Sequence, residues 1–201
     1  MRFTTRSFFL PAYKYTGMTI ESDAVKSVAG LMALAARTAP KAVGIDSIKI
    51  EVLAGKEQAK LGDEMIRMGK ATGLDFFRTN GEKVQESDAT LLVGVEGRKG
   101  PGANCGGCGF ASCAGMAKAA QAKKAKTLYG GPNCVLKISD LGIAVGSAVK
   151  TAAIHNVDNR IMFTAGVAAL AQGRLAGCSV AYGIPLKASG KNIFFDVAIR
   201  H

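Results

Sequence analysis

The sequence lacks a hydrophobic run long enough to cross a bilayer. A membrane-spanning helix needs about 20 predominantly apolar residues, and the longest apolar stretches, 141–149 and 161–171, are interrupted by basic residues before reaching that length. The apolar run Phe8–Leu10 stops at Pro11, which leaves it too short for the core of a secretion signal. We therefore expect a soluble, cytoplasmic protein in which residues 1–17 form an N-terminal extension.

Tryptophan is absent, aromatic residues make up 6% of the chain, and 15 acidic residues face 26 basic ones for a net charge of +11. Such an excess indicates an anionic partner, which could be nucleic acid or an acidic protein. Nucleic-acid surfaces interleave aromatic side chains for base stacking, yet only Tyr129 lies near the lysines at 118, 123, 124 and 126. We therefore expect no nucleic-acid binding.

Helical and extended patterns alternate along the chain. With 201 residues and 48% hydrophobic composition, the sequence predicts one globular domain over 18–201. The fold class is α/β (α+β), with a single sheet flanked by helices. The predicted helices are 22–38, 56–70, 141–154 and 160–172, and the predicted strands are 48–52, 91–95, 178–182 and 193–195.

Several local signals set the expected boundaries. Ser22 or Asp23 is expected to cap the first helix, Ser139 or Asp140 the helix at 141–154, and Asp158 the last helix. A short extended piece is expected at 76–77, with turns at 80–81 and at Pro185. His155 ends a helix without a carboxylate or serine nearby in sequence, so we assign it no catalytic role.

The helix at 141–154 is apolar on nearly all sides. Gly142 and Gly146 lie one turn apart on it and allow close approach of a neighbour. The pattern therefore predicts a helix buried in the core or at a subunit interface.

The segment 97–139 differs in composition from the rest of the chain. It holds nine of the 25 glycines, four of the five cysteines, seven basic residues and no acid. We interpret it as an inserted module. The fifth cysteine, Cys178, lies in an apolar strand pattern and is expected to be a small buried hydrophobe.

Four cysteines in this module have the spacing of a metal centre. Two, four and twenty residues separate Cys105, Cys108, Cys113 and Cys134. A [4Fe-4S] cluster takes one thiolate per iron, so a close trio can wrap three corners and a distant fourth cysteine can close the site. Neighbouring glycines let the backbone turn tightly and aim N–H groups at an anionic cluster. The sequence therefore predicts one [4Fe-4S] cluster.

Three alternatives use the same residues. Structural zinc also takes four cysteines, but its sites usually pair two Cys-x-x-Cys knuckles, and only one is present here. A disulfide framework is disfavoured because closely spaced loop cysteines in a protein with an otherwise ordinary core suggest a reducing compartment. Plant-type [2Fe-2S] spacing runs four then two, the reverse of this order. A zinc-stabilised binding module is the main alternative.

The cysteine motif resembles the small four-iron domain of electron-transfer and corrinoid iron–sulfur proteins. Residues 18–196 as a whole resemble an uncharacterised prokaryotic family of ferredoxin-domain-containing proteins. The stretches that carry this resemblance are 21–25, 35–42, the cysteine motif, 140–144, 157–160, 183–186 and 190–193. The resemblance implies cluster ligation by the four cysteines and little else. The electron-transfer role that we expect rests on the four-cysteine spacing inside a basic, glycine-rich insert.

A looser resemblance is to the FMN-dependent nitroreductases, which are homodimers with FMN at the subunit interface. It rests on a helix ending in Ala39-Pro40, an edge strand, the helix at 140–154 and Gly183-Ile184-Pro185. It implies a nitroreductase-like fold, a homodimer and an FMN oxidoreductase fed by the cluster. The candidate flavin contacts are Arg6, Lys41, Lys191 and Asn192, whereas 41–44 lacks the Asn and Gln that contact the flavin ring in that family.

The positive charge is concentrated around the proposed cluster. Segment 97–139 contributes seven of the eleven net charges. These basic residues would partly compensate an anionic cluster and could dock an acidic redox protein of the ferredoxin or flavodoxin type.

Overall fold

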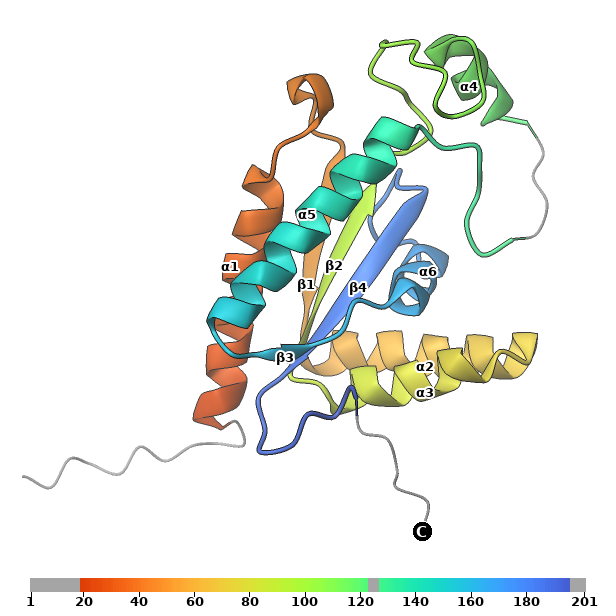
Figure 1. The fold of residues 1–201 in the computed structure, drawn as a ribbon. Helices are drawn as coiled ribbons and strands as arrows, with labels where there is room; N and C mark the ends of the chain where they lie inside the picture. The colour runs from red at the N-terminus through yellow and green to blue at the C-terminus, as the bar shows by residue number, and fades with distance from the viewer. Residues whose placement is uncertain (1–18, 123–126, 196–201) are drawn as a thin grey trace, which may run out of the picture.

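The computed structural model describes residues 19–122 and 127–195. This part of the chain forms a four-stranded antiparallel sheet in the order β1-β2-β4-β3 with helices on both faces (Figure 1). The strands are β1 (Ile48–Leu53), β2 (Ala89–Val95), β3 (Asp158–Asn159) and β4 (Val180–Lys187). The helices are α1 (Ile20–Thr38), the 3-10 turn η1 (Ala42–Gly44), α2 (Gly55–Thr72), α3 (Asp75–Glu86), α4 (Cys113–Ala119), α5 (Val135–Ile154) and α6 (Phe163–Ala171). The predicted fold class is confirmed.

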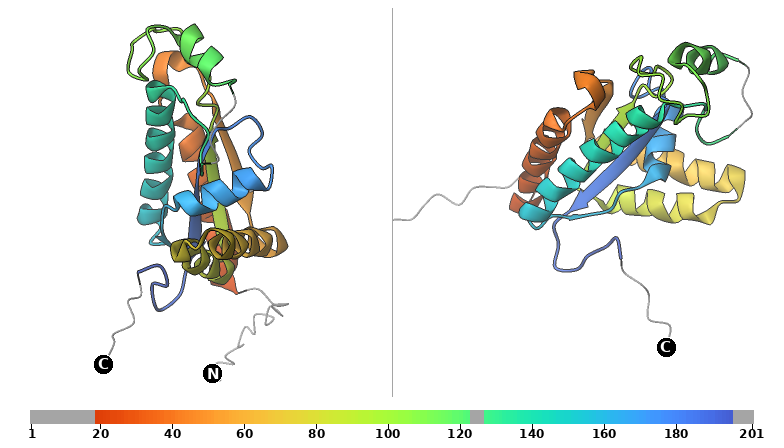
Figure 2. Two further views of the ribbon diagram at one scale, coloured as in Figure 1. Left: turned by 90° about the vertical axis from the view of Figure 1, so that its right-hand side faces the viewer. Right: turned by 45° about the horizontal axis from the view of Figure 1, so that its top comes forward.

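The core lies on the two faces of β2 and β4. All seven residues of β2 are buried, as expected for an apolar strand covered on both sides. One set of side chains, including Leu91 and Ile184, packs under α1 and α5. The alternate set, including Leu92 and Ala181, packs under α2 and α6 (Figure 2). The sheet therefore separates two hydrophobic layers.

The side of the sheet covered by α2, α3 and α6 depends on close helix contacts. A Cβ on Gly166 of α6 would lie 1.8 Å from the carbonyl oxygen of Ala181, so α6 touches the backbone of β4. Likewise a Cβ on Gly81 would lie 2.8 Å from the Gly62 carbonyl, where α3 crosses α2. The turn expected at 80–81 and the extended piece at 76–77 are therefore wrong, because Gly81 serves helix packing within α3 and does not end an element.

The helix starts also differ from the predicted caps. Thr19 caps α1, its hydroxyl accepting the N–H of Ser22 at 3.2 Å, so Ser22 and Asp23 lie in the first turn. Helix α5 begins at Val135, well before Ser139 and Asp140. The last five residues of the predicted inserted module thus belong to α5.

The C-terminal part departs further from expectation. Asp158 lies in β3 and does not cap α6, which begins at Phe163. Pro185 lies inside β4 and not in a turn. It stands between Gly183, which pairs with Met162, and Leu186, which pairs with Asn159 of β3. Residues 193–195 form bends and no strand. No helix in the described residues is both long and apolar enough to span a membrane.

Candidate metal centre

The four predicted ligands lie beyond one end of the sheet, around the starts of α4 and α5 (Figure 1). Cys105 and Cys108 lie in the loop before α4, Cys113 is the first residue of α4, and Cys134 directly precedes α5. All four are free thiols, exposed at Cys105 and only 3% exposed at Cys134. The fold therefore brings residues up to 29 positions apart into one module.

Two glycines show how close the sulfur atoms come. A Cβ on Gly100 would lie 2.7 Å from the Sγ of Cys113 and 3.7 Å from the Sγ of Cys134. A Cβ on Gly107 would lie 3.8 Å from the Sγ of Cys105 and 2.6 Å from a methyl carbon of Val135, the residue after Cys134. Glycine is therefore the residue that leaves room for these thiols.

A small hydrophobic core supports the ligands. Cys134 packs with Met116 and Ala120 of α4, and the partly buried Cys108 and Phe110 pack against them. This core is separate from the two main ones. It fixes α4 against the start of α5 and shelters one side of the cysteine site.

The loop backbone turns sharply between the first three cysteines. Asn104, Gly106 and Gly109 all have positive φ angles, at 47°, 73° and 82°, a region that Gly and Asn tolerate best. The Gly109 N–H donates to the Gly106 carbonyl at 2.9 Å, and the Asn104 side-chain oxygen accepts the Cys113 N–H at 2.8 Å. These bonds close the loop around the site.

A short hydrogen-bond chain positions Cys134. The Cys134 N–H donates to the Gly97 carbonyl at 2.7 Å. The Gly97 N–H donates to the Ser179 hydroxyl at 3.1 Å, and that hydroxyl donates to Asn133 at 2.5 Å. The end of β2 and the start of β4 therefore hold the fourth ligand.

The local field favours an anion at this place. Cys134 is the N-cap of the 20-residue helix α5 and no side chain caps its first turn. The unpaired N–H groups and the helix dipole place partial positive charge there. The thiols, the flexible glycines and this positive end fit an anionic iron–sulfur cluster. In the described residues, no three Cys, His, Asp or Glu side chains are arranged to hold a single metal ion.

Comparisons with known proteins identify the family of the chain. A model of the family described as "Uncharacterized protein containing a ferredoxin domain" matches residues 130–197, and an Fe-S cluster family model matches residues 101–127. A protein of Archaeoglobus fulgidus, described as uncharacterized, is 42% identical over 178 residues, which cover 89% of this chain and 94% of that one. The chain belongs to this ferredoxin-domain family. It is an iron–sulfur protein.

Solved structures establish the fold of this ferredoxin-domain protein. It is similar to a nitroreductase with bound FMN from Desulfitobacterium hafniense (13% identity, TM-score 0.53, 82% of this chain and 78% of that one) and to nitroreductase CinD from Lactococcus lactis (15%, 0.52, 88% and 86%). It also matches nitroreductase A from Vibrio parahaemolyticus (12%, 0.51, 89% of this chain), of which it spans only 63%. The fold is nitroreductase-like.

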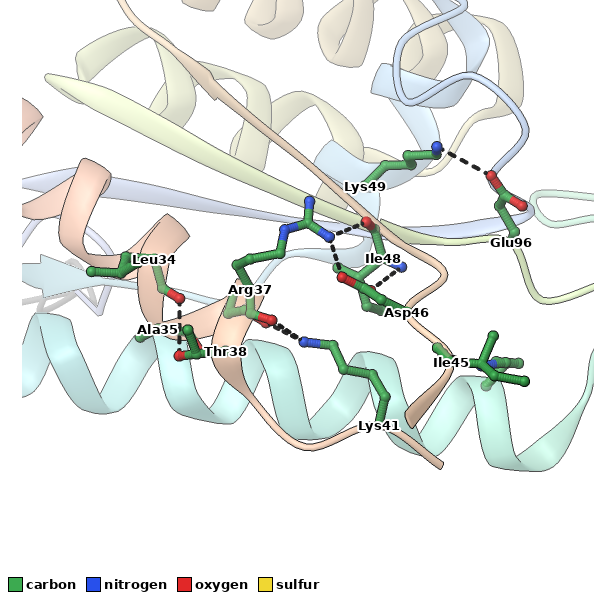
Figure 3. A network of polar contacts seen from close by, with 12 residues as sticks. Leu34, Ala35, Arg37, Thr38, Lys41, Ile45, Asp46, Ile48, Lys49 and Glu96 are labelled. Carbon is green, nitrogen blue, oxygen red and sulfur yellow. Dashed lines mark hydrogen bonds and ion pairs between the residues drawn. The ribbon is translucent and has the colours of Figure 1, made fainter. Parts of the chain in front are cut away.

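The structure does not bring the candidate flavin residues of the ferredoxin-domain protein together. Arg6 lies outside the described residues. The Lys41 ammonium donates to the carbonyls of Ala36 (3.0 Å) and Arg37 at the end of α1 (Figure 3). Lys191 and Asn192 belong to the segment that follows β4, which lies at the opposite end of the sheet from the loop after α1 (Figure 1). The Asn192 amide donates to Asp158 at 2.9 Å.

The loop after Lys41 is tied to neighbouring elements by charged groups. Arg37 donates to Asp46 at 2.5 Å and to the Ile48 carbonyl at 2.8 Å (Figure 3). Burial acts to raise the pKa of Asp46, but the hydrogen bonds from the Ile48 N–H and Arg37 outweigh it and lower that pKa. On the other side of the strand, Lys49 pairs with Glu96 at 3.4 Å.

A buried ion pair near the centre was not predicted from the sequence. Lys137 and Asp140, both 2% exposed, face each other at 3.3 Å within α5. Lys137 also donates to the Ile45 carbonyl at 2.7 Å, and Asp140 accepts the Ala42 N–H at 2.8 Å. Lysine and aspartate three residues apart on an apolar helix were the available signal, since paired charges are the ones that are buried.

Tyr129 connects the module to the domain, and Cys178 lies near the end of β2. The Tyr129 hydroxyl donates to the carbonyls of Phe163 (3.2 Å) and Ala181, and burial together with nearby Tyr182 raises its pKa far above the usual value. Cys178, the fifth thiol, is half-buried, and burial followed by the nearby Glu96 charge raises its pKa to about 11.

Proposed function

We propose that this iron–sulfur protein binds one [4Fe-4S] cluster through Cys105, Cys108, Cys113 and Cys134 and passes single electrons. The observation that carries the proposal is the approach of the Cys113 and Cys134 sulfurs to the side-chain-free Gly100. When bound, the cluster supplies a one-electron redox centre. The loop at 104–109 wraps one side, and the start of α5 provides positive potential on the other.

Surface charge supports an acidic redox protein as electron donor. Arg98, Lys99 and Lys118 are exposed around the cysteine site, and none makes an ion pair with another described residue. The segment 97–139 contains no acid. Complementary charge speeds encounter between partners and orients them, so a ferredoxin- or flavodoxin-like protein would dock on this module.

A second candidate function is an FMN oxidoreductase fed by the cluster. The nitroreductase-like fold supports it. In such an enzyme the flavin lies between two subunits, so Lys41 of one copy and Lys191 with Asn192 of another would approach one flavin from two sides. Lys41 and Asn192 would then exchange their present hydrogen bonds for contacts with the flavin.

The outer face of α1 and α5 supports the required homodimer. Leu34 is 60% exposed and Ile143 is 45% exposed. A Cβ on Gly142 or Gly146 would meet nothing within 4 Å. This apolar face with two small residues would admit a second copy. Sedimentation of the wild type as a dimer and of Leu34→Lys as a monomer would support the interface, and a monomeric wild type would count against it.

One anaerobic preparation tests both functions. We expect four iron and four sulfide per chain, lost in Cys134→Ala and retained in the matched variant Cys178→Ala. FMN released on denaturation, or bound after reconstitution, would support the flavin enzyme, and its absence in both would leave the electron carrier alone. Stoichiometric zinc without iron or sulfide would replace the cluster with a zinc-stabilised module.

A further inference from the structure

A cleft of about 440 Å³ lies next to the cysteine site. One wall is formed by residues 45–47, and the opposite wall by residues 99–102. Gly100, in the second wall, is the residue that borders the sulfurs of Cys113 and Cys134. The cleft is therefore separated from the proposed cluster by a single residue without a side chain, and its volume falls within the ~300–1,000 Å³ typical of small-molecule sites.

Two polar groups in this cleft have unused hydrogen-bonding capacity. The Ser47 hydroxyl oxygen is shielded from solvent and makes no hydrogen bond in the described part of the chain. Lys137 lines the cleft while only 2% exposed, and its ammonium donates to Ile45 and Asp140. An ammonium has three N–H donors, so one donor remains. Buried polar groups normally find partners, and a bound ligand would supply one here.

The charges on the cleft walls favour an anion. Its two carboxylates are already paired, Asp46 with Arg37 at 2.5 Å and Glu96 with Lys49 at 3.4 Å. Lys137 is balanced by Asp140. Lys99 is exposed and forms no ion pair with any described residue. Among the described side chains, Lys99 is therefore the one charged group of the cleft walls without an ion-pair partner.

We propose that this cleft binds a small oxyanion, a carboxylate or a phosphate group, through Lys137, Ser47 and Lys99. An oxyanion has several acceptor positions, which match the free ammonium proton of Lys137, the Ser47 hydroxyl and the charge of Lys99. Anion binding is a property beyond electron transfer by the cluster. The calorimetric test does not need the cluster, which serves only as a spectroscopic probe of the bound anion.

Calorimetric titration of the anaerobic full-length protein tests the site. Sodium phosphate and sodium succinate are titrated separately at constant ionic strength set with sodium chloride, so that the two arms distinguish the phosphate from the carboxylate. We expect saturable one-site binding of at least one of them. Affinity should fall about tenfold in Lys99→Gln, which loses a charged hydrogen bond, and about threefold in Ser47→Ala, which loses a neutral one.

Lys118→Gln is the matched control, because Lys118 is an exposed lysine of the same module that does not line the cleft. It should bind like the wild type. Where the sample contains iron and sulfide, the bound anion should also shift the paramagnetic resonance spectrum of the reduced centre. No saturable binding of either anion, or equal weakening in Lys118→Gln, would overturn the site. A sample without iron and sulfide would refute the cluster, and the calorimetry would still decide the cleft.

Discussion

The buried ammonium of Lys137 lies 3.3 Å from the carboxylate of Asp140. Lys137 is in the first turn of α5, three residues after Cys134. The pair holds the loop at 42–45 through the Ile45 carbonyl and the Ala42 N–H. That loop includes Val43 at a φ of 49°, which is strained for a β-branched residue. The pair thus links the start of α5 to a loop that would not hold its conformation alone.

Breaking this pair should be costly. Lys137→Met leaves the Asp140 charge buried and unpaired, so we expect a loss of about 3–5 kcal/mol in the free energy of unfolding. The double variant Lys137→Met with Asp140→Leu should lose less than the single variant, because no uncompensated charge remains. Denaturant unfolding of the wild type, both single variants and the double variant measures the coupling. Additive effects would show that the two residues act independently.

Gly100→Ala should prevent cluster assembly. Its Cβ would lie 2.7 Å from the Cys113 sulfur, a separation that forces the thiol or the loop to move. Gly30→Ala on α1 is the control, because a Cβ there meets nothing within 4 Å. We expect iron bound per chain to fall in Gly100→Ala and to stay at the wild-type level in Gly30→Ala. Full iron content in Gly100→Ala would refute the assigned packing.

Ser179→Ala should loosen the fourth ligand. The substitution removes the hydroxyl that accepts the Gly97 N–H and donates to Asn133. The Gly97 N–H keeps its bond to the Val95 carbonyl, but the Asn133 side-chain oxygen loses its donor, and an unpaired buried group costs about 1–3 kcal/mol. Since Gly97 holds the Cys134 N–H, iron should leave faster when the protein is challenged with a chelator. Ser189→Ala, an exposed serine in the segment after β4, should release iron at the wild-type rate. Equal rates in all three proteins would remove Ser179 from the support of the site.

Cys178 should make the protein less stable in alkali. Burial raises its pKa from 9.0 to about 11 in the fold, so between these values the folded state binds more protons than the unfolded one. Its contribution is therefore fully present below pH 9 and is lost as the pH rises toward 11. Stability measured across this range should fall less steeply in Cys178→Ala than in the wild type. Identical slopes would show that the thiol is not perturbed.

The sequence predicted most elements because their signals are local. Alternating or helical apolar residues identified β1, β2, α1 and α2. Gly81 and Pro185 misled because both residue types often mark turns. Gly81 is instead required by the contact between α3 and α2, and Pro185 lies inside β4, opposite Thr90 of β2. Such reasons depend on residues distant in sequence, which local patterns do not contain.

The candidate site divides in the same way. The cysteine spacing was visible in the sequence. The structure places the four cysteines in the loop before α4, at the start of α4 and just before α5, with the Cys113 and Cys134 sulfurs both close to Gly100. The roles of Ser179, Lys137 and Ser47 were not visible in the sequence. Ser179 and Lys137 bond to Gly97 and Ile45, which lie more than 40 residues away along the chain. Ser47 lines a cleft that forms only when the chain folds. These residues are identified by their contacts in the folded protein, and no sequence motif contains them.

The most direct test of the account is a redox titration of the anaerobic protein followed by electron paramagnetic resonance. We expect one unpaired electron per chain on reduction, appearing in a single one-electron step, present in Cys178→Ala and absent in Cys134→Ala. An iron-containing wild type that gives no such signal, or a signal that survives in Cys134→Ala, would contradict a single [4Fe-4S] cluster held by the four cysteines.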